Sequence, residues 1–172
     1  MALFLPVKEK SPQYGENCWF APNATIVGNV TMGKDCTVWF NAVVRGDVNA
    51  IIMGNRVNIQ DGAIIHCTYQ KTATTIGNNV SIAHNAIVHG CTIEDEVLIG
   101  MGAIVMDGAV IGKNSIIGAG AIVTQNTIVP PGTIWAGNPA KYIKDVTKDL
   151  GEVFMRTANN YVMYAEWFKD PV

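Results

Sequence analysis

Apolar residues recur along the chain at every sixth position. One unbroken run of eight such positions comprises residues 93, 99, 105, 111, 117, 123, 129 and 135. The same spacing covers most of the chain from Tyr14 onward, with shifts in phase near residues 50–52, across 71–75 and just before Ile93. A small or β-branched residue stands four positions after each apolar residue, as Cys18 does after Tyr14. Each hexad therefore supplies one large and one small side chain to an interior.

A period of six fits neither a helix of 3.6 residues per turn nor an alternating strand. It suits short straight segments joined by turns, and such segments bury their apolar side only when successive turns stack into a solenoid. Corner sequences such as Asp61-Gly62 and Asp107-Gly108 tolerate the positive φ angles that tight bends need. The alternative is a β-sandwich of short strands, which predicts alternation with period two and turns every 8–12 residues. The observed period favours the solenoid.

The hexads that begin at Ile99, Ile111 and Ile117 resemble the hexapeptide repeat of left-handed parallel β-helices. The resemblance covers roughly residues 14–140. It implies an all-β solenoid of about seven triangular coils, with three hexads to a coil and a left-handed sense that departs from the usual crossover rule. The expected β-helix domain is residues 1–140, including a short N-terminal segment.

The spacing of apolar residues changes after Pro139. From Ile143 to Phe168 they follow one another at steps of three and four, which predicts an amphipathic helix. We therefore expect residues 141–172 to form a C-terminal α-helix that packs on the coil and covers an exposed edge.

Composition restricts the class of protein further. The chain is 49% hydrophobic and 15% charged, with a formal net charge of −2, so it offers no basic surface for nucleic acid and is not disordered. No apolar run approaches the roughly 18 residues of a membrane span, and the N-terminus lacks a basic region typical of a secretion signal. Four cysteines without a CxxC pair favour reduced thiols and a cytoplasmic location.

The three histidines fall into two columns of a triangular coil. On one face, the position after the inward residue is Arg45, His66 and His89 on three successive coils. On another face, the position two after the inward residue is Asp61 and then His84. Stacked coils lie about 4.8 Å apart, so His66 and His89 become neighbours that can share a metal ion.

His84 cannot easily join them within one chain. It lies five residues before His89, about 16 Å of extended chain at ~3.3 Å per residue, whereas metal–nitrogen bonds require imidazoles almost in contact. All three converge when the His84 face of one subunit meets the His66–His89 face of the next, as in a cyclic homotrimer. Arg45 and Asp61 would then pair across that interface. The alternative is three unrelated surface histidines, with Arg45-Gly46-Asp47 forming a solvated turn.

Three neutral imidazoles leave a fourth position open on a tetrahedral Zn²⁺, which is the catalytic pattern. Fe²⁺ and Co²⁺ also accept three imidazoles. Several separate segments resemble the γ-class carbonic anhydrases and their close relatives in order and spacing: Val44–Asp47, Asn58–Asp61, Ile65-His66 and His84–Cys91.

That resemblance implies reversible hydration of CO₂ to bicarbonate by a zinc-bound hydroxide at the subunit interface. It implies His66, His84 and His89 as metal ligands. By matching position, Gln60 orients the hydroxide or the substrate, and Asn58 is a further candidate in the same block. The remaining positions that it implies are an interface network of Arg45, Asp47 and Asp61, and an aromatic side chain near the site, Tyr161.

One departure from the family predicts weak activity. Members with established activity carry glutamates that shuttle protons in a loop, but the corresponding segment here, Cys67–Thr75, contains no acid and no histidine. Three other functions stay open. They are acyl transfer from CoA with one histidine as base, a non-catalytic metal-binding trimer, and hydrolysis of an ester or thioester. The sequence offers no basic cluster for the phosphates of CoA, which disfavours the first.

Overall fold

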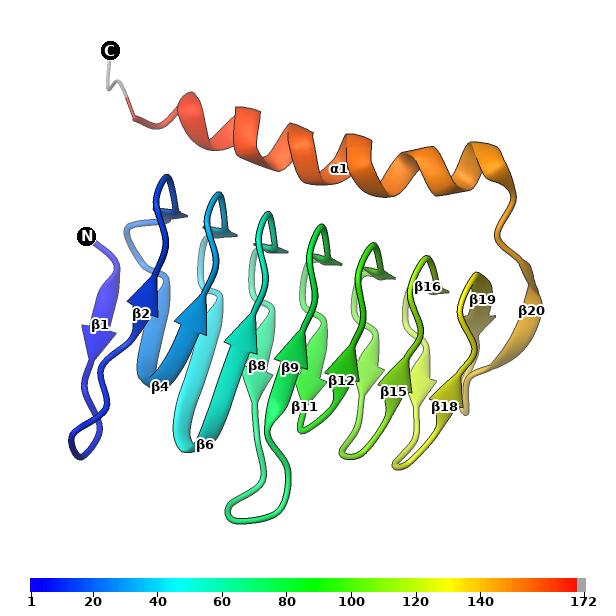
Figure 1. The fold of residues 1–172 in the computed structure, drawn as a ribbon, viewed down its shortest axis with the longest axis horizontal. Helices are drawn as coiled ribbons and strands as arrows, with labels where there is room; N and C mark the ends of the chain where they lie inside the picture. The colour runs from blue at the N-terminus through cyan, green and yellow to red at the C-terminus, as the bar shows by residue number, and fades with distance from the viewer. Residues whose placement is uncertain (170–172) are drawn as a thin grey trace.

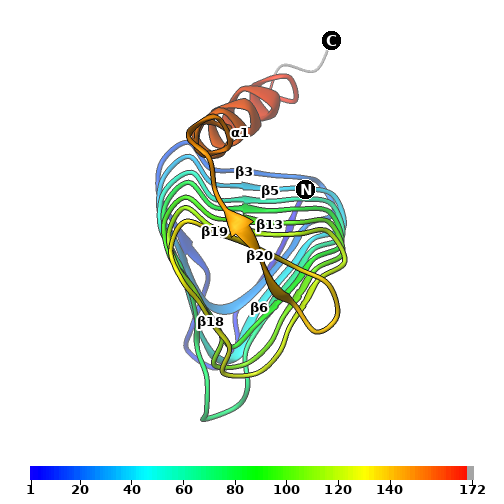
Figure 2. The same ribbon diagram turned by 90° about the vertical axis from the view of Figure 1, so that its right-hand side faces the viewer.

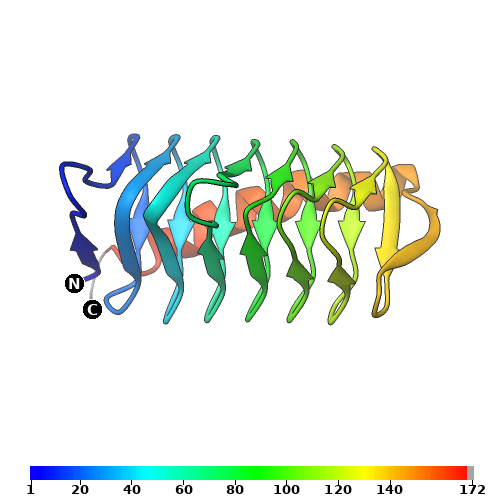
Figure 3. The same cartoon turned by 90° about the horizontal axis from the view of Figure 1, so that it is seen from below.

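A computed structural model describes residues 1–169 as a parallel β-solenoid of about seven coils with a single C-terminal helix (Figure 1). Seen along its axis, the solenoid has a triangular outline with the helix on one side (Figure 2). Strands of successive coils pair in parallel along each face, which confirms the predicted solenoid and excludes the sandwich. Viewed from below, the coils stack in one row from the N-terminal end to the C-terminal end (Figure 3).

Short strands form the three faces, and two longer ones turn a corner between the first and third faces. The first face contains β2 (Gln13–Tyr14), β9 (Thr74–Ile76), β12 (Thr92–Ile93), β15 (Val110–Ile111) and β18 (Ile128–Val129). The second contains β3 (Trp19–Phe20), β5 (Thr37–Val38), β7 (Asn58–Ile59), β10 (Ser81–Ile82), β13 (Leu98–Ile99), β16 (Ile116–Ile117) and β19 (Thr133–Ala136). The third contains β1 (Leu3–Leu5), β8 (Ile64–His66), β11 (Ile87–His89), β14 (Ile104–Val105) and β17 (Ile122–Val123). The corner-spanning strands are β4 (Thr25–Met32) and β6 (Val43–Met53).

The register of these strands confirms the predicted columns. On the third face Val44 pairs with Ile65, Ile65 with Val88, and Val88 with Val105. The large residues of these columns are buried against small ones such as Ala63, and both kinds have essentially no exposed surface. Each segment packs one large and one small side chain into the core. This packing maintains the six-residue repeat, because either a void or an extra methylene group would destabilise the fold.

The predicted corner at Asp61-Gly62 is confirmed. Gly62 has φ of 69°, and a Cβ added there would lie 2.2 Å from Oδ1 of Asn85 on the next coil. A side chain at this corner would therefore collide with the stacked coil as well as strain the backbone.

The C-terminal segment differs from the prediction at its start. Residues 141–145 form strand β20 (Lys141–Asp145), which pairs antiparallel with β19, and helix α1 (Lys148–Glu166) begins only after it. The open edge of the last coil offers backbone hydrogen bonds that a helix over 141–147 could not satisfy. Residues 170–172 of the predicted helical segment lie outside the described residues.

Helix α1 runs along the second face and packs on β5 and β10 (Figures 1 and 2). Its buried residues are Phe154, Ala158 and Ala165. Within residues 1–169 no helix has the length and apolar character needed to cross a membrane.

Candidate metal centre

His66 and His89 end two adjacent strands of the third face. Strands β8 and β11 place them in register, and Nδ1 of His66 lies 3.1 Å from Nε2 of His89. Their side chains are 16% and 31% exposed, so both rings are partly shielded and still reachable from outside. The predicted adjacency of these two histidines is confirmed.

A carboxylate holds the other nitrogen of each ring. Nε2 of His66 lies 3.0 Å from Oδ1 of Asp47, and Nδ1 of His89 lies 3.1 Å from Oδ1 of Asp107. Burial raises the pKa of Asp47, but hydrogen bonds from His66 and Arg45 and the charge of Arg45 outweigh it, leaving that pKa below its usual value. For Asp107, burial also raises the pKa, and hydrogen bonds from Thr72, Thr68 and His89 again bring it below the usual value. Both groups are therefore carboxylates at neutral pH.

This hydrogen bonding makes the histidine pair a suitable half of a metal site. Each carboxylate accepts an N–H from its imidazole, so both facing nitrogens, Nδ1 of His66 and Nε2 of His89, are left with a lone pair. Two lone pairs 3.1 Å apart repel unless a proton or a cation lies between them. Two nitrogens bonded to one tetrahedral Zn²⁺ lie about 3.3 Å apart, close to the separation observed. The residues present thus fit the metal that the sequence predicts.

His84 lies on the second face, just after β10. Its Nδ1 is 3.0 Å from Oδ2 of Asp61, and each of these two side chains is 43% exposed. This contact leaves Nε2 of His84 as the nitrogen available to bind a metal ion. Among residues 1–169 of a single chain, no three His, Cys, Asp or Glu side chains are grouped so that they could hold a metal.

An aromatic hollow of about 310 Å³ adjoins His84. Its lining combines His84 and Asp61 with Trp39, Phe40, Tyr161, Tyr164, Trp167 and Phe168. Tyr161 of helix α1 packs edge-to-face on Trp39, with ring centroids 5.4 Å apart. Burial, then the nearby Asp61 carboxylate and Tyr164, raise the pKa of Tyr161 to about 12, so its phenol is neutral at physiological pH. Tyr161 thus lies on the His84 side of the chain.

Asn58 and Gln60 are buried on the same face, with 1% and 4% of their surface exposed. Nε2 of Gln60 donates to Oδ1 of Asn58 at 3.0 Å, and Nδ2 of Asn58 donates to Oγ of Ser81 at 2.8 Å. The candidate residues therefore divide into two sets. One set surrounds His66 and His89, and the other accompanies His84.

The predicted interface network is partly satisfied within the chain. Arg45 pairs with Asp47, and Asp61 pairs with His84, so an Arg45–Asp61 pair between subunits stays a prediction. The segment Arg45-Gly46-Asp47 lies in the corner-spanning strand β6, and the side chains of Arg45 and Asp47 are 44% and 25% exposed.

Sequence reasoning missed Asp107 and the hydroxyls of Thr68 and Thr72. Asp107 stands 18 residues after His89. Val88 pairs with Val105, 17 residues further on, so the position in register with His89 is Met106, and Asp107 comes one residue after it. Extending the histidine column by one coil therefore gives a methionine, and the sequence pattern carried no signal for the carboxylate beside His89.

Two models of hexapeptide repeats match the chain. They are the bacterial transferase hexapeptide (six repeats), over residues 15–46 and 90–125, and the hexapeptide repeat of succinyl-transferase, over residues 73–106. A carbonic anhydrase of Geobacillus kaustophilus is 40% identical over 167 residues, which cover 97% of this chain and 91% of that protein. The chain belongs to the γ-carbonic anhydrase-like family of hexapeptide-repeat proteins.

Other relatives and solved structures are similar to this γ-carbonic anhydrase-like chain over most of its length. Gamma carbonic anhydrase 3, mitochondrial, of Arabidopsis thaliana is 48% identical over 165 residues, which cover 93% of this chain. The chain spans 59–64% of the length of three plant relatives that it matches.

Two solved structures share the whole fold. A hexapeptide transferase family protein from Anaplasma phagocytophilum has a TM-score of 0.92 at 36% identity, covering 96% of this chain and 98% of that one. A Bacillus cereus protein provisionally called an acetyltransferase has a TM-score of 0.94 at 38% identity, covering 98% and 97%.

Proposed function

We propose that this chain hydrates CO₂ reversibly to bicarbonate at a zinc site shared by two subunits of a homotrimer. The observation that carries the proposal is the facing pair of His66 and His89 nitrogens, 3.1 Å apart, with each ring anchored from behind by a carboxylate. Family membership supports the same activity, because relatives of similar length are named carbonic anhydrase.

The third face offers a surface for the neighbouring subunit. Its outward positions form a continuous aliphatic column beside the histidine pair, and every member is at least partly exposed in the single chain: Val43, Ile64, Ile87, Ile104 and Ile122. A contiguous apolar strip of this kind is typical of a protein–protein interface. When the His84 face of one subunit covers it, the same contact repeats around a closed ring of three.

The chain's own residues set up the ligands. Asp47 and Asp107 fix the tautomer and orientation of His66 and His89, and Asp61 does the same for His84, leaving one free nitrogen on each ring. His66, His89 and the neighbouring subunit's copy of His84 would hold Zn²⁺, whose chemistry would be to acidify water and so supply a nucleophile for CO₂. The aromatic hollow beside His84 would admit CO₂, which is uncharged. The same apolar lining would bind the bicarbonate anion poorly and so favour its release. In this proposal Gln60 orients the substrate or the water from the His84 side, and Fe²⁺ or Co²⁺ could replace Zn²⁺.

The test combines metal content with catalysis. We expect the trimer loaded with zinc to hold about one ion per chain and to accelerate CO₂ hydration in a stopped-flow assay. Removal of the metal with a chelator should abolish the rate, and added zinc should restore it. A zinc-loaded trimer that hydrates CO₂ no faster than buffer would contradict the proposal and favour a non-catalytic metal-binding trimer.

Acyl transfer from CoA is the second candidate, because solved relatives carry transferase names. It needs a donor site, which titration calorimetry with acetyl-CoA would detect. Tight binding of acetyl-CoA to the trimer would favour this candidate over the hydratase.

A further inference from the structure

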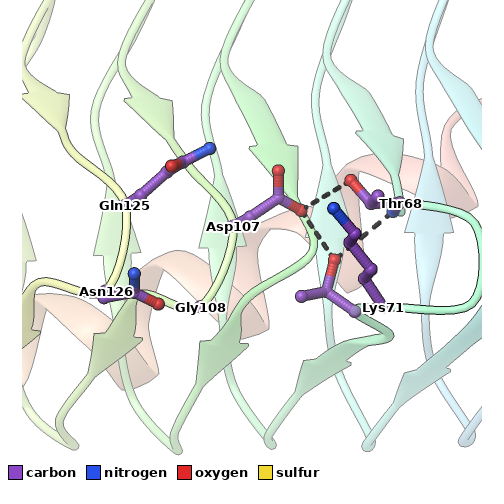
Figure 4. A pocket seen from close by; sticks show the side chains of 7 residues that line it. Thr68, Lys71, Asp107, Gly108, Gln125 and Asn126 are labelled. Carbon is purple, nitrogen blue, oxygen red and sulfur yellow. Dashed lines mark hydrogen bonds between the residues drawn. The ribbon is translucent and has the colours of Figure 1, made fainter.

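The segment between β8 and β9 leaves the coil as a loop that projects beyond the neighbouring corners (Figure 1). Its threonines point back toward the coil. Oγ1 of Thr68 and Oγ1 of Thr72 donate to Oδ1 of Asp107 at 3.0 and 2.6 Å, at the edge of a recess of about 270 Å³ (Figure 4). Oγ1 of Thr74 donates to the backbone oxygen of His66 at 2.7 Å and accepts the N–H of Gly90 at 3.0 Å. The loop is therefore tied to Asp107 by its own threonines, and Thr74, the first residue of β9, ties its end to both strands that carry the histidine pair.

The same oxygen that receives these hydroxyls also receives the ring of His89. Oδ1 of Asp107 lies 3.1 Å from Nδ1 of His89, so three donors converge on one carboxylate oxygen. The two hydroxyls fix where that oxygen lies, and the oxygen in turn fixes the plane and the tautomer of the imidazole.

Gly90, the residue after His89, packs directly against the side chains of Asp107 and Thr72. Gly90 has φ of 54°, and a Cβ added to it would lie 1.9 Å from Oδ1 of Asp107 and 2.2 Å from Oγ1 of Thr72. Even a methyl group at residue 90 would displace the carboxylate or the hydroxyl, so this glycine leaves room for the contact.

We infer that Asp107 is a positioning residue for the ligand His89, and that Thr68 and Thr72 of the projecting loop hold it in place. The inference rests on the proposed metal site. It gives the loop, which has no acid or histidine to carry protons, the task of fixing one ligand of the metal. Neither threonine touches a ligand itself, so both act through the carboxylate.

The affinity for zinc, measured by competition with a chromophoric chelator, tests the inference without relying on catalysis. We expect Asp107→Ala to weaken zinc binding about 10–100-fold, and Thr72→Val, which removes only the hydroxyl, to weaken it several-fold. Gly90→Ala should weaken it about 10-fold or more. Its matched control is Gly120→Ala, a glycine with a similar φ of 66° and no atom within 4 Å of an added Cβ, which should leave the affinity unchanged.

Thermal unfolding of the zinc-free variants separates positioning from general stability. If Thr72→Val and Gly90→Ala bind zinc as tightly as the unmodified chain, the inference is wrong although the metal site stands. The inference is also wrong if each loss of affinity follows a proportional loss of zinc-free stability, with Gly120→Ala behaving like Gly90→Ala. Failure of the unmodified trimer to bind zinc would instead overturn the proposed function.

Discussion

Replacing His84 with alanine will deprive the proposed trimer of zinc while leaving each chain folded. The side chain is 43% exposed and pairs with the equally exposed side chain of Asp61, so the core of the coil loses nothing. In the proposed site this histidine supplies one of three ligands. Loss of a hydrogen-bonded group behind a ligand commonly costs 10–100-fold in affinity, so loss of the ligand itself should cost at least about 100-fold. Zinc analysis and CO₂ hydration should fall together, with an unchanged circular dichroism spectrum.

The matched control for His84→Ala is Met101→Ala. Met101 occupies the same column one coil further along, is 58% exposed, and has no donor for the metal beyond a weak thioether. We expect it to keep its zinc. Retention of zinc by His84→Ala, or equal losses in both variants, would show that His84 is not a ligand.

Replacing Ile64 with aspartate will dissociate the trimer. Ile64 is 41% exposed in the aliphatic column, between Val43 and Ile87, so a carboxylate there is solvated in the free chain and becomes unpaired and buried on assembly. Burial of an unpaired charge costs several kcal/mol, enough to break an interface that repeats three times around the ring. Sedimentation velocity should show monomers, and zinc binding should disappear with the trimer.

Ile128→Asp provides the comparison. Ile128 is 69% exposed on the first face, outside the column, so the same change of charge should leave the trimer and its zinc intact. A trimeric Ile64→Asp variant that still binds zinc would place the interface elsewhere.

The columns of the coil could be predicted from sequence because stacking leaves few choices. Inward positions such as Ile65 and Val88 must repeat with the length of a coil, and the residues that follow them, His66 and His89, then align without further information. Counting positions along the coil in the same way places His84 on a different face from His66 and His89.

Features that depend on the path of the backbone outside the hexads could not be predicted. Strand β20 replaces the first turns of the expected helix because the last coil presents an open edge, which a spacing of apolar residues does not reveal. The contacts of Thr68 and Thr72 with Asp107 depend on how the projecting loop folds back, and threonines in a loop carry no such signal in sequence.

Mixing two inactive variants tests the shared site most directly. His84→Ala chains keep His66 and His89, and His89→Ala chains keep His84, so a trimer that contains both has one interface with all three imidazoles. When equal amounts assemble at random, about three quarters of the trimers contain both variants, and each of these has one complete site out of three. The mixture should therefore recover roughly one quarter of the zinc sites and of the CO₂ hydration rate. Each variant alone should show neither. If unfolding and reassembly of the mixture recovers no zinc, the ligands do not come from two subunits and the account is wrong.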